Sequence, residues 1–284
     1  MLLAIDVGNT NTVLGLYNAD SPELVADWRI TTHRNQTSDE YGVLFLNLFA
    51  MRQIDVSKIT AIVVSSVVPP LDTTIRRLCE RYFGLRPMFV EPGIKTGMPL
   101  LVDNPAELGA DRIVNGVAAF ARYGGPIIVV DFGTATTFDV ITARGEYIGG
   151  VIAPGLGISA DALFSRAAKL ARVDIRRPAR TIGTNTIAHL QSGLFYGYIG
   201  LVDGILERML AEVQSGQPSG AATPKVIATG GLAHMLANDS KFITTIDDML
   251  TLDGLRLLYE RNRNPRSRGA SQPLPPANAS ISSS

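Results

Sequence analysis

Two short segments of the chain place an aspartate, a glycine and several hydroxyl or amide side chains in the same order. The first is Asp6-Val7-Gly8-Asn9-Thr10-Asn11-Thr12, and the second is Asp131-Phe132-Gly133-Thr134-Ala135-Thr136-Thr137. Glycine lets the backbone approach an anion, and the amides and hydroxyls of such a turn can donate hydrogen bonds to phosphate oxygens. An aspartate at the end of a buried strand suits hydrated Mg²⁺ beside those phosphates. Either segment alone could be an ordinary hairpin turn, but together they predict a clamp for a polyphosphate and its cations.

A third segment, Ala228-Thr229-Gly230-Gly231-Leu232, ends an apolar strand with paired glycines before a predicted helix. Such a loop lets a flat ring lie close to the backbone, as an adenine would require. The three segments in this order therefore point to ATP as the ligand.

The block Gly109-Ala110-Asp111-Arg112 adds a carboxylate and a guanidinium in the first turns of a predicted helix. Phosphoryl transfer needs a residue that orients the attacking hydroxyl and groups that neutralise charge. Asp111 could orient the hydroxyl, while Arg112 could bind a carboxylate of the substrate. The alternative is an exposed capping pair that contributes little to stability.

The elements that must position these residues follow from the hydrophobic pattern and the turn residues. Short apolar runs bounded by turns predict strands at 2–7, 12–17, 24–30, 61–67, 88–90, 127–131, 137–142, 146–152 and 225–229. Apolar residues at helical spacing predict helices at 38–51, 71–83, 106–123, 158–170 and 186–213, and a last helix that ends near Tyr259.

The element order repeats one plan, in which three meander strands precede crossover strands and helices. We therefore predict an α/β fold with a mixed sheet in each of two domains. The predicted division lies near residue 115, which gives an N-terminal domain of 1–115 and a C-terminal domain of 116–262. Residues 263–284 are rich in Pro, Ser, Asn and Arg and are predicted to form a disordered tail.

Composition limits the partners. The chain has 284 residues, 46% of them hydrophobic and 18% charged, and its formal net charge is +0, so no global field attracts nucleic acid or anionic lipid. The N-terminal apolar run is too short for a signal peptide, and no stretch is long enough to cross a bilayer, so a cytoplasmic protein is expected. The single cysteine, Cys79, excludes an intramolecular disulfide and a cysteine-rich zinc site.

The four motifs, in this order and over residues 1 to about 260, resemble the type III pantothenate kinases, and Gly109-Ala110-Asp111-Arg112 distinguishes that family from other actin-like kinases. The resemblance implies two ribonuclease-H-like domains of the actin-like ATPase kind, with the active site in the cleft between them, and a homodimer. It also implies transfer of the ATP γ-phosphoryl group to the primary hydroxyl of pantothenate, the first step of coenzyme A biosynthesis. Mg²⁺ and a monovalent cation, K⁺ or NH₄⁺, are the cofactors expected beside ATP.

The resemblance also implies roles for individual residues. Asp111 stands in the place of the catalytic base, Asp131 in that of the monovalent-cation ligand, and Thr134 in that of a further ATP contact. Thr186 falls where the family contacts pantothenate. Asp6 is the Mg²⁺ ligand expected from its place at the end of a strand. The substrate loop corresponds to Gly109, Ala110, Asp111 and Arg112, and the ATP phosphate loop corresponds to Asp6, Val7, Gly8, Asn9, Thr10, Asn11, Thr12 and Val13.

One position departs from the family pattern. Active relatives often carry a tyrosine seven residues before Gly109, where it lines the pantothenate pocket, and this chain has Val102 there. Valine can pack against the ligand but offers no hydroxyl, so a weakly active or non-catalytic regulatory protein remains an alternative. A further alternative is an actin-like kinase for another sugar or carboxylate, which the pair Asp111-Arg112 disfavours.

The predicted helix at 186–213 is apolar over more of its surface than one compact domain requires. We expect it to pack on its own sheet with one side and on a second subunit with the other, with Tyr198 facing outward. Four glycines, Gly193, Gly197, Gly200 and Gly204, would permit close approach of another helix. The alternative is a central helix buried wholly within one subunit.

Overall fold

The computed structural model describes residues 1–19, 21–167, 170–216 and 222–263. The chain forms two compact units. The first contains Met1–Lys95 together with the chain from Leu255 onward, and the second contains Thr96–Gly254. The division therefore follows Lys95 instead of falling near residue 115. Apart from Arg263, the tail predicted at 263–284 lies outside the described residues.

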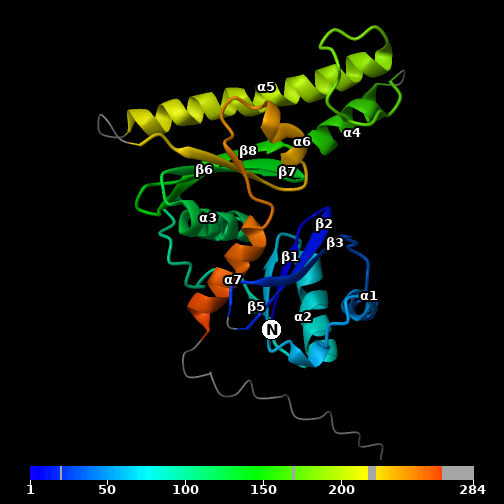
Figure 1. Ribbon diagram of the computed structural model, residues 1–284, viewed down its shortest axis with the longest axis vertical. Helices are drawn as coiled ribbons and strands as arrows, with labels where there is room; N and C mark the ends of the chain where they lie inside the picture. Colours follow the sequence, from blue (N-terminus) through cyan, green and yellow to red (C-terminus); the bar gives the residue numbers. More distant parts are fainter. Residues whose placement is uncertain (20, 168–169, 217–221, 264–284) are drawn as a thin grey trace, which may run out of the picture. The chain divides into compact units, whose positions relative to one another are not determined.

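The first unit is built on a five-stranded mixed sheet with the strand order β3-β2-β1-β4-β5. Its strands are β1 (Leu2–Val7), β2 (Asn11–Tyr17), β3 (Leu24–Thr31), β4 (Ala61–Ser66) and β5 (Met88–Phe89). β1 is antiparallel to β2 and parallel to β4. The helices α1 (Ser38–Met51) and α2 (Pro69–Phe83) belong to this unit (Figure 1). Their apolar residues and those of the central strands form its core. A short 3₁₀ helix, η1 (Val56–Lys58), precedes β4.

The second unit repeats this plan with the strand order β10-β9-β6-β7-β8. Its strands are β6 (Ile127–Phe132), β7 (Ala135–Ile141), β8 (Tyr147–Pro154), β9 (Lys225–Thr229) and β10 (Thr245–Ile246). β6 is antiparallel to β7 and parallel to β9, so it has the position that β1 has in the first sheet. The helices α5 (Thr186–Ser215) and α3 (Ala110–Tyr123) cover opposite faces of this sheet (Figure 1).

Shorter elements connect these layers. They are η2 (Pro105–Glu107), α4 (Leu156–Arg166), α6 (Ala233–Leu236), η3 (Ala237–Asp239) and α7 (Leu250–Asn262). The part of α7 from Leu255 onward belongs to the first unit. Two hydrogen bonds of 3.0 Å attach its end there, because the Asn262 side chain accepts from the Lys95 amide and donates to the Lys95 carbonyl oxygen. The guanidinium of Arg256 lies 5.8 Å from the centre of the Tyr17 ring.

The predicted mixed sheets are confirmed, and most elements begin and end near the predicted residues. The helix predicted at 38–51 begins as expected, because the Thr37 side chain accepts from the Glu40 amide while the Glu40 carboxylate accepts from the Thr37 amide. The predicted start of a helix at Ala106 is wrong. A separate 3₁₀ turn capped by Asn104 occupies those positions, and α3 begins only after Gly109, which has non-helical backbone angles.

The outward position predicted for Tyr198 on α5 is also wrong. Tyr198 is only 5% exposed and faces its own sheet. Its hydroxyl lies 2.5 Å from Thr136 Oγ1 and donates to the Pro154 carbonyl oxygen at 3.1 Å. Tyrosine can be buried here because its polar end finds partners at the edge of the sheet.

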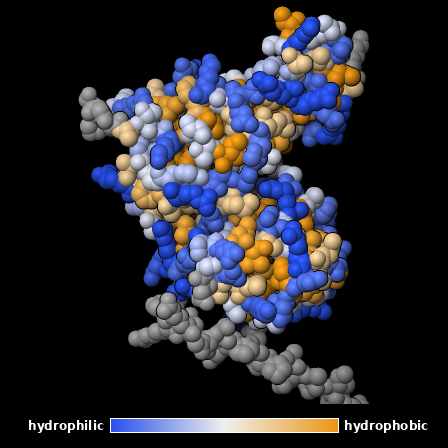
Figure 2. Space-filling view, in the orientation of Figure 1, coloured by the Kyte–Doolittle hydropathy of each residue, from blue (hydrophilic) through white to orange (hydrophobic). Residues whose placement is uncertain are grey.

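The surface carries both polar and apolar residues, and the single cysteine lies in the interior. Hydrophilic and hydrophobic residues are interspersed over the face shown in Figure 2. Within the described ranges, no helix is both long and apolar enough to cross a bilayer. Cys79 is fully buried on α2, and this burial raises the pKa of its thiol to about 12, so it is not a reactive thiolate.

Candidate active site

The segment predicted as the first phosphate loop is the tight turn between β1 and β2. The Gly8 amide donates a hydrogen bond of 3.0 Å to the Asn11 carbonyl oxygen, which closes the turn. A Cβ at position 8 would lie 2.9 Å from that oxygen, so glycine is required for the close approach. Asp6 lies next to the end of β1 and pairs in register with Val13 on β2 and with Ser65 on β4.

The side chains of this loop divide into exposed and buried groups. Asn9 and Thr10 are exposed, whereas Thr12 is fully buried and its hydroxyl lies 2.9 Å from the Thr32 hydroxyl. The Thr12 side chain thus braces β2, and the donors that face solvent come from the turn itself. Val7 is also fully buried.

A basic residue that the sequence analysis missed lies beside this loop. The exposed Arg34 donates a hydrogen bond of 2.7 Å from Nη2 to Asn9 Oδ1. Its segment is tied to the turn by the bond from the Thr32 amide to the Thr10 carbonyl oxygen. This pairing joins residues far apart in sequence, and no local pattern around Arg34 indicates it.

The second segment predicted to bind phosphate is the turn between β6 and β7, at the corresponding place in the second unit. The Gly133 amide donates to the Ala135 carbonyl oxygen at 3.1 Å, and the exposed Thr134 accepts through its carbonyl oxygen from the Gly155 amide at 3.1 Å. Gly155 is the N-cap residue directly before α4, so the loop and the start of this helix are fixed to each other. The repeated pattern of aspartate, glycine and hydroxyl thus gives a turn closed by the glycine amide in both units, and the second turn is one residue shorter than the first.

Asp131, at the end of β6, is held by the helix α3. The buried Asn115 donates from Nδ2 to Asp131 Oδ2 at 3.0 Å, and Thr251 Oγ1 donates to Asn115 Oδ1 at 2.7 Å. Gly230 has a φ of 93°, and a Cβ there would overlap Asp131 Oδ1. The first glycine of the third motif therefore leaves room for the Asp131 carboxylate, whereas the sequence suggested room for an adenine ring.

Asp111 lies in the first turn of α3. Its Oδ1 accepts a hydrogen bond of 2.8 Å from the amide of Arg112. A Cβ at Gly109 would lie 2.6 Å from the same oxygen, so glycine at the start of the helix leaves room for the carboxylate. Burial raises the pKa of Asp111 above the ordinary aspartate value, while the Arg112 amide and positive charge oppose this change. A carboxylate with raised proton affinity suits a general base.

Arg112 is paired with a buried aspartate that the sequence analysis missed. Its Nε donates to Asp139 Oδ1 at 2.7 Å, and the Tyr147 hydroxyl donates to the same oxygen at 2.6 Å. Asp139 on β7 has a side-chain exposure of 0%, and the Arg112 side chain one of 14%. Burial acts to lower the pKa of the Arg112 guanidinium, but the Asp139 carboxylate outweighs it and raises that pKa above its ordinary value. The sequence contains one signal for this pair, because Asp139 is an acidic residue between the apolar residues Phe138 and Val140 of a predicted strand.

The two remaining predicted substrate residues have different surroundings. Val102 is partly buried and follows Leu101, whose amide donates to the Tyr147 carbonyl oxygen at 2.8 Å. Thr186 is exposed at the start of α5, next to Asn185, whose side chain caps the helix. Among the described residues, no hydrogen bond or ion pair joins Thr186 to Asp111 or Arg112.

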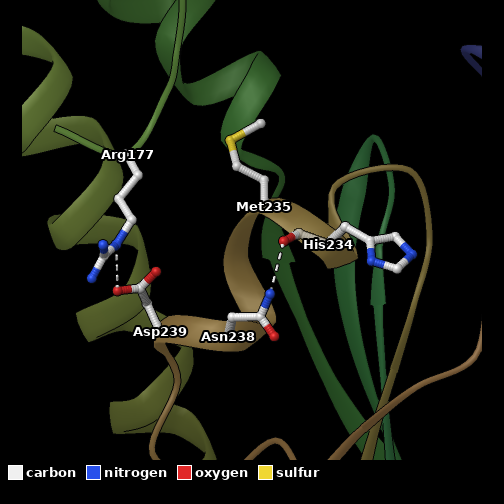
Figure 3. Close-up of a pocket in the computed structure, with 5 residues that line it drawn as sticks. All are labelled: Arg177, His234, Met235, Asn238 and Asp239. Carbon is white, nitrogen blue, oxygen red and sulfur yellow. Dashed lines mark hydrogen bonds and ion pairs between the residues drawn. The ribbon is translucent and has the colours of Figure 1, made fainter.

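A cavity of about 470 Å³ in the second unit contains none of the predicted site residues. Figure 3 shows the lining residues Arg177, His234, Met235, Asn238 and Asp239. Arg177 Nε donates to Asp239 at 2.9 Å, and the His234 ring points away from this pair, toward Asp248 (2.7 Å). The charged groups around this cavity are already paired, and we assign it no role in catalysis.

The donor groups limit the kind of metal site. In the part of the chain that the structure describes, no three His, Cys, Asp or Glu side chains are grouped to hold a metal ion. A cation beside Asp6 or Asp131 would therefore complete its ligands with water, backbone carbonyl oxygens or phosphate oxygens. These are ligands that Mg²⁺ and K⁺ accept.

Two ribonuclease-H-like sheets, each with an aspartate and a glycine turn after its central strand, define the actin-like ATPase fold, to which many small-molecule kinases belong. Solved structures agree. A Campylobacter jejuni protein described as a Baf family transcriptional activator matches with a TM-score of 0.56 at 20% identity, covering 92% of this chain and 98% of that one. A 2-dehydro-3-deoxygalactonokinase protein from Sinorhizobium meliloti matches with a TM-score of 0.52 at 12% identity, with the same coverage.

Sequence comparison identifies the family. The model of the type III pantothenate kinases matches residues 2–208. The type III pantothenate kinase of Koribacter versatilis is 60% identical over 277 residues, which cover 94% of this chain and 98% of the relative. That of Acidobacterium capsulatum is 55% identical over 272 residues, which cover 94% and 97%. The chain belongs to the type III pantothenate kinase family.

The raised pKa of Asp111 predicts the pH dependence of the reaction. If Asp111 acts as the predicted general base it must be unprotonated, so kcat/KM should fall as the pH falls through this raised pKa, at higher pH than for an ordinary aspartate. In Asp111→Asn, turnover should fall by about 10²- to 10⁴-fold. Initial rates of both proteins from acid to neutral pH check this.

Stability provides the control for this variant. Because the fold raises the pKa of Asp111, the folded state binds a proton on the Asp111 carboxylate more tightly than the unfolded chain does. Ionised Asp111 therefore costs stability at neutral pH, and the cost disappears as the pH falls below the folded-state pKa. Asp111→Asn should be at least as stable as the wild type at pH 7, and near-native activity in that folded variant would remove Asp111 from the mechanism.

Proposed function

We propose that the protein is an ATP-dependent pantothenate kinase that forms 4′-phosphopantothenate in the first step of coenzyme A biosynthesis. The observation that carries the proposal is the full-length similarity to proteins named type III pantothenate kinase, at 60% identity for the Koribacter relative. The pair Asp111 and Arg112 at the start of α3 supports it, because it offers a base and a carboxylate-binding group on adjacent residues. We place the enzyme in the cytoplasm, where ATP is available.

In the proposed reaction, Asp111 accepts the proton of the primary hydroxyl of pantothenate. The hydroxyl oxygen forms a bond to the γ-phosphorus as the bond from that phosphorus to the bridging oxygen breaks, and the electron pair leaves with ADP. Arg112 binds the pantothenate carboxylate, and Gly109, Val102 and Thr186 complete the acceptor site. The amides of the first phosphate loop and Thr134 donate to the phosphates of ATP.

Cations would supply the charge neutralisation that this reaction needs. Asp6 would hold hydrated Mg²⁺, and Asp131 would hold K⁺ or NH₄⁺. The Asn115 amide holds one oxygen of Asp131 and the backbone turns at Gly133 and Gly230 lie close to the other, an oxygen-rich setting with little room for a large ligand. Arg34 is the basic side chain beside the first loop and is a further candidate phosphate contact.

The second candidate function is a non-catalytic or weakly active regulator. Val102 is the observation that favours it, since the family's usual tyrosine hydroxyl is missing from a segment bonded to Tyr147. A coupled or radiolabelled ATP assay distinguishes the two. We expect phosphorylation of pantothenate at a kcat/KM well above that for other hydroxy acids and sugars, and absence of turnover with every acceptor would support the regulator.

We predict that K⁺ or NH₄⁺ stimulates this activity severalfold over Na⁺ at equal ionic strength, because the loops offer acids but few lysines to neutralise the phosphates. The measurement is the initial rate in matched chloride buffers containing saturating Mg²⁺. In Asp131→Asn the stimulation should disappear. Equal rates of the wild type in K⁺ and Na⁺ would rule out a specific monovalent site.

We further propose that α5 forms a homodimer interface. Gly193, Gly197 and Gly200 are exposed on its outer side, and a Cβ at any of them would meet no atom within 4 Å. Leu201, on the same side, is 37% exposed, and Ile187, near the start of the helix, is 55% exposed. Small residues beside exposed apolar ones suit the close approach of a second helix, and Thr186 would then reach the partner's acceptor site.

Light scattering should accordingly give about twice the chain mass of 30.4 kDa. Leu201→Glu should lower both the mass and the activity, because it places a charge in the interface. Val43→Glu is the matched control, since Val43 is 56% exposed on α1 of the first unit and should tolerate the charge. A fully active monomer would contradict the proposed interface.

A further inference from the structure

The side chains around Arg112 form a closed hydrogen-bonded group. Asp139 Oδ1 accepts from both Arg112 Nε and the Tyr147 hydroxyl, and Thr137 Oγ1 donates to Asp139 Oδ2 at 3.3 Å. These partners come from α3, β7 and β8, so three elements determine the position of the Asp139 carboxylate. The Arg112 guanidinium carbon lies 5.9 Å from the centre of the Tyr147 ring, which gives the guanidinium a second contact.

The strand β8 leaves space for this guanidinium. Gly150 is the register partner of Asp139, and a Cβ there would lie 2.7 Å from Arg112 Nη2. Nη2 also lies 2.7 Å from Asp139 Oδ1 but is buried without a hydrogen bond of normal geometry. Asp139 therefore occupies the edge of the guanidinium formed by Nε and Nη2. None of the described residues accepts a hydrogen bond from Nη1.

The ion pair also changes how Arg112 can recognise a ligand. A buried carboxylate beside the guanidinium makes the pair electrically neutral overall, so little net charge remains to attract a second carboxylate. Recognition must then depend on the direction of the remaining N–H groups, because hydrogen bonds weaken steeply away from linear geometry. The N–H groups of a flexible arginine would have no fixed direction, whereas Asp139 and Tyr147 fix the orientation of the Arg112 guanidinium.

We propose that Asp139, itself held by Tyr147, is a positioning residue that orients the Arg112 guanidinium toward the carboxylate of the acceptor substrate. This inference rests on the proposed function, and specifically on Arg112 as the group that binds this carboxylate. Asp139 acts through Arg112 and touches neither ATP nor the reacting hydroxyl. Its contribution is selectivity for an acid over an uncharged acceptor.

The chain contains a matched group for comparison at the other end of α3. There Arg122 Nη1 and the Tyr123 hydroxyl donate to Asp247 Oδ2 at 2.5 and 2.8 Å. Arg122 follows Arg112 by ten residues, about 15 Å along the helix. The two groups share an arginine, a buried aspartate and a tyrosine. Arg122 is more exposed than Arg112 and also pairs with Asp253, so loss of Asp247 should cost less stability than loss of Asp139.

The experiment compares pantothenate with its alcohol analogue, in which a hydroxyl group replaces the carboxylate. For the full-length wild type, Asp139→Asn and Tyr147→Phe, kcat and KM are measured with both acceptors. We expect the preference for the acid, expressed as a ratio of kcat/KM values, to fall on the order of tenfold to a hundredfold in Asp139→Asn, the range for one hydrogen bond to a charged group. Tyr147→Phe should show a smaller fall, and the KM for ATP should stay unchanged.

Two controls separate positioning from a structural role. Asp247→Asn should lower stability without changing the acid preference. Arg112→Gln should abolish the preference, and adding Asp139→Asn to it should change the ratio no further, because residues that act through one group are not additive. If Asp139→Asn does not fold, the acid preference of Tyr147→Phe tests the proposal instead, since that variant removes one hydroxyl only.

The inference is overturned if Asp139→Asn slows both acceptors equally, or if its effect adds fully to that of Arg112→Gln. Failure of the proposed function looks different, because the wild type would then phosphorylate some other hydroxy acid. The same ratio would be measured with that acid and its alcohol. A wild type that does not distinguish an acid from its alcohol would overturn the role of Asp139 and leave the kinase activity intact.

Discussion

The central strand of each sheet has one antiparallel and one parallel neighbour, and this constraint determines what surrounds the aspartate near the end of that strand. An antiparallel neighbour can follow through a tight turn, whereas a parallel neighbour requires a long crossover. The carboxyl end of the central strand therefore meets a glycine turn on one side and the end of a parallel strand on the other. Asp6 on β1 and Asp131 on β6 both lie at this position. In the second unit Gly230, which follows the parallel strand β9, lies directly against Asp131.

The helix α3 connects the groups of the second unit to which we assign roles in the proposed reaction. It carries Asp111 and Arg112 in its first turn and Asn115 one turn later, where residues four apart lie on the same side of a helix. Asn115 holds Asp131, and Arg112 is held by Asp139. The proposed base, the acceptor-binding group and the cation ligand are thus fixed to one element. The start of α3 at Ala110, which depends on Gly109, sets the position of all of them.

The repeated fold could be predicted from the sequence because its signals are local. Turn glycines such as Gly8 and Gly133 and short apolar runs identified the two meanders. Apolar residues at helical spacing identified α1, whose start is stabilised by the reciprocal cap of Thr37 and Glu40. The predicted start of α3 failed because Pro105 begins a separate 3₁₀ turn whose composition also suits a helix.

What the sequence could not provide were contacts between distant residues. Asp139 and Tyr147 lie on neighbouring strands, and their common partner Arg112 lies on a helix before both, so nothing local to any one of them shows the group. Arg34 reaches Asn9 in the same way. Tyr198 was placed on the wrong side of α5 because apolar residues surround most of that helix, and only its bonds to Thr136 and Pro154 show which side faces the sheet.

The return of the chain to the first unit at Leu255 has a consequence for biosynthesis. The second unit is continuous in sequence, whereas the first is interrupted by it and includes the end of α7. Asn262 bonds to Lys95 and Arg256 lies near Tyr17, so residues from the beginning and from the end of the described part of the chain belong together. Synthesis proceeds from the N-terminus and domains generally fold as units. The ribosome therefore releases the whole second unit before the residues that complete the first, and nascent chains that end before Leu255 would carry a first unit without its final helix.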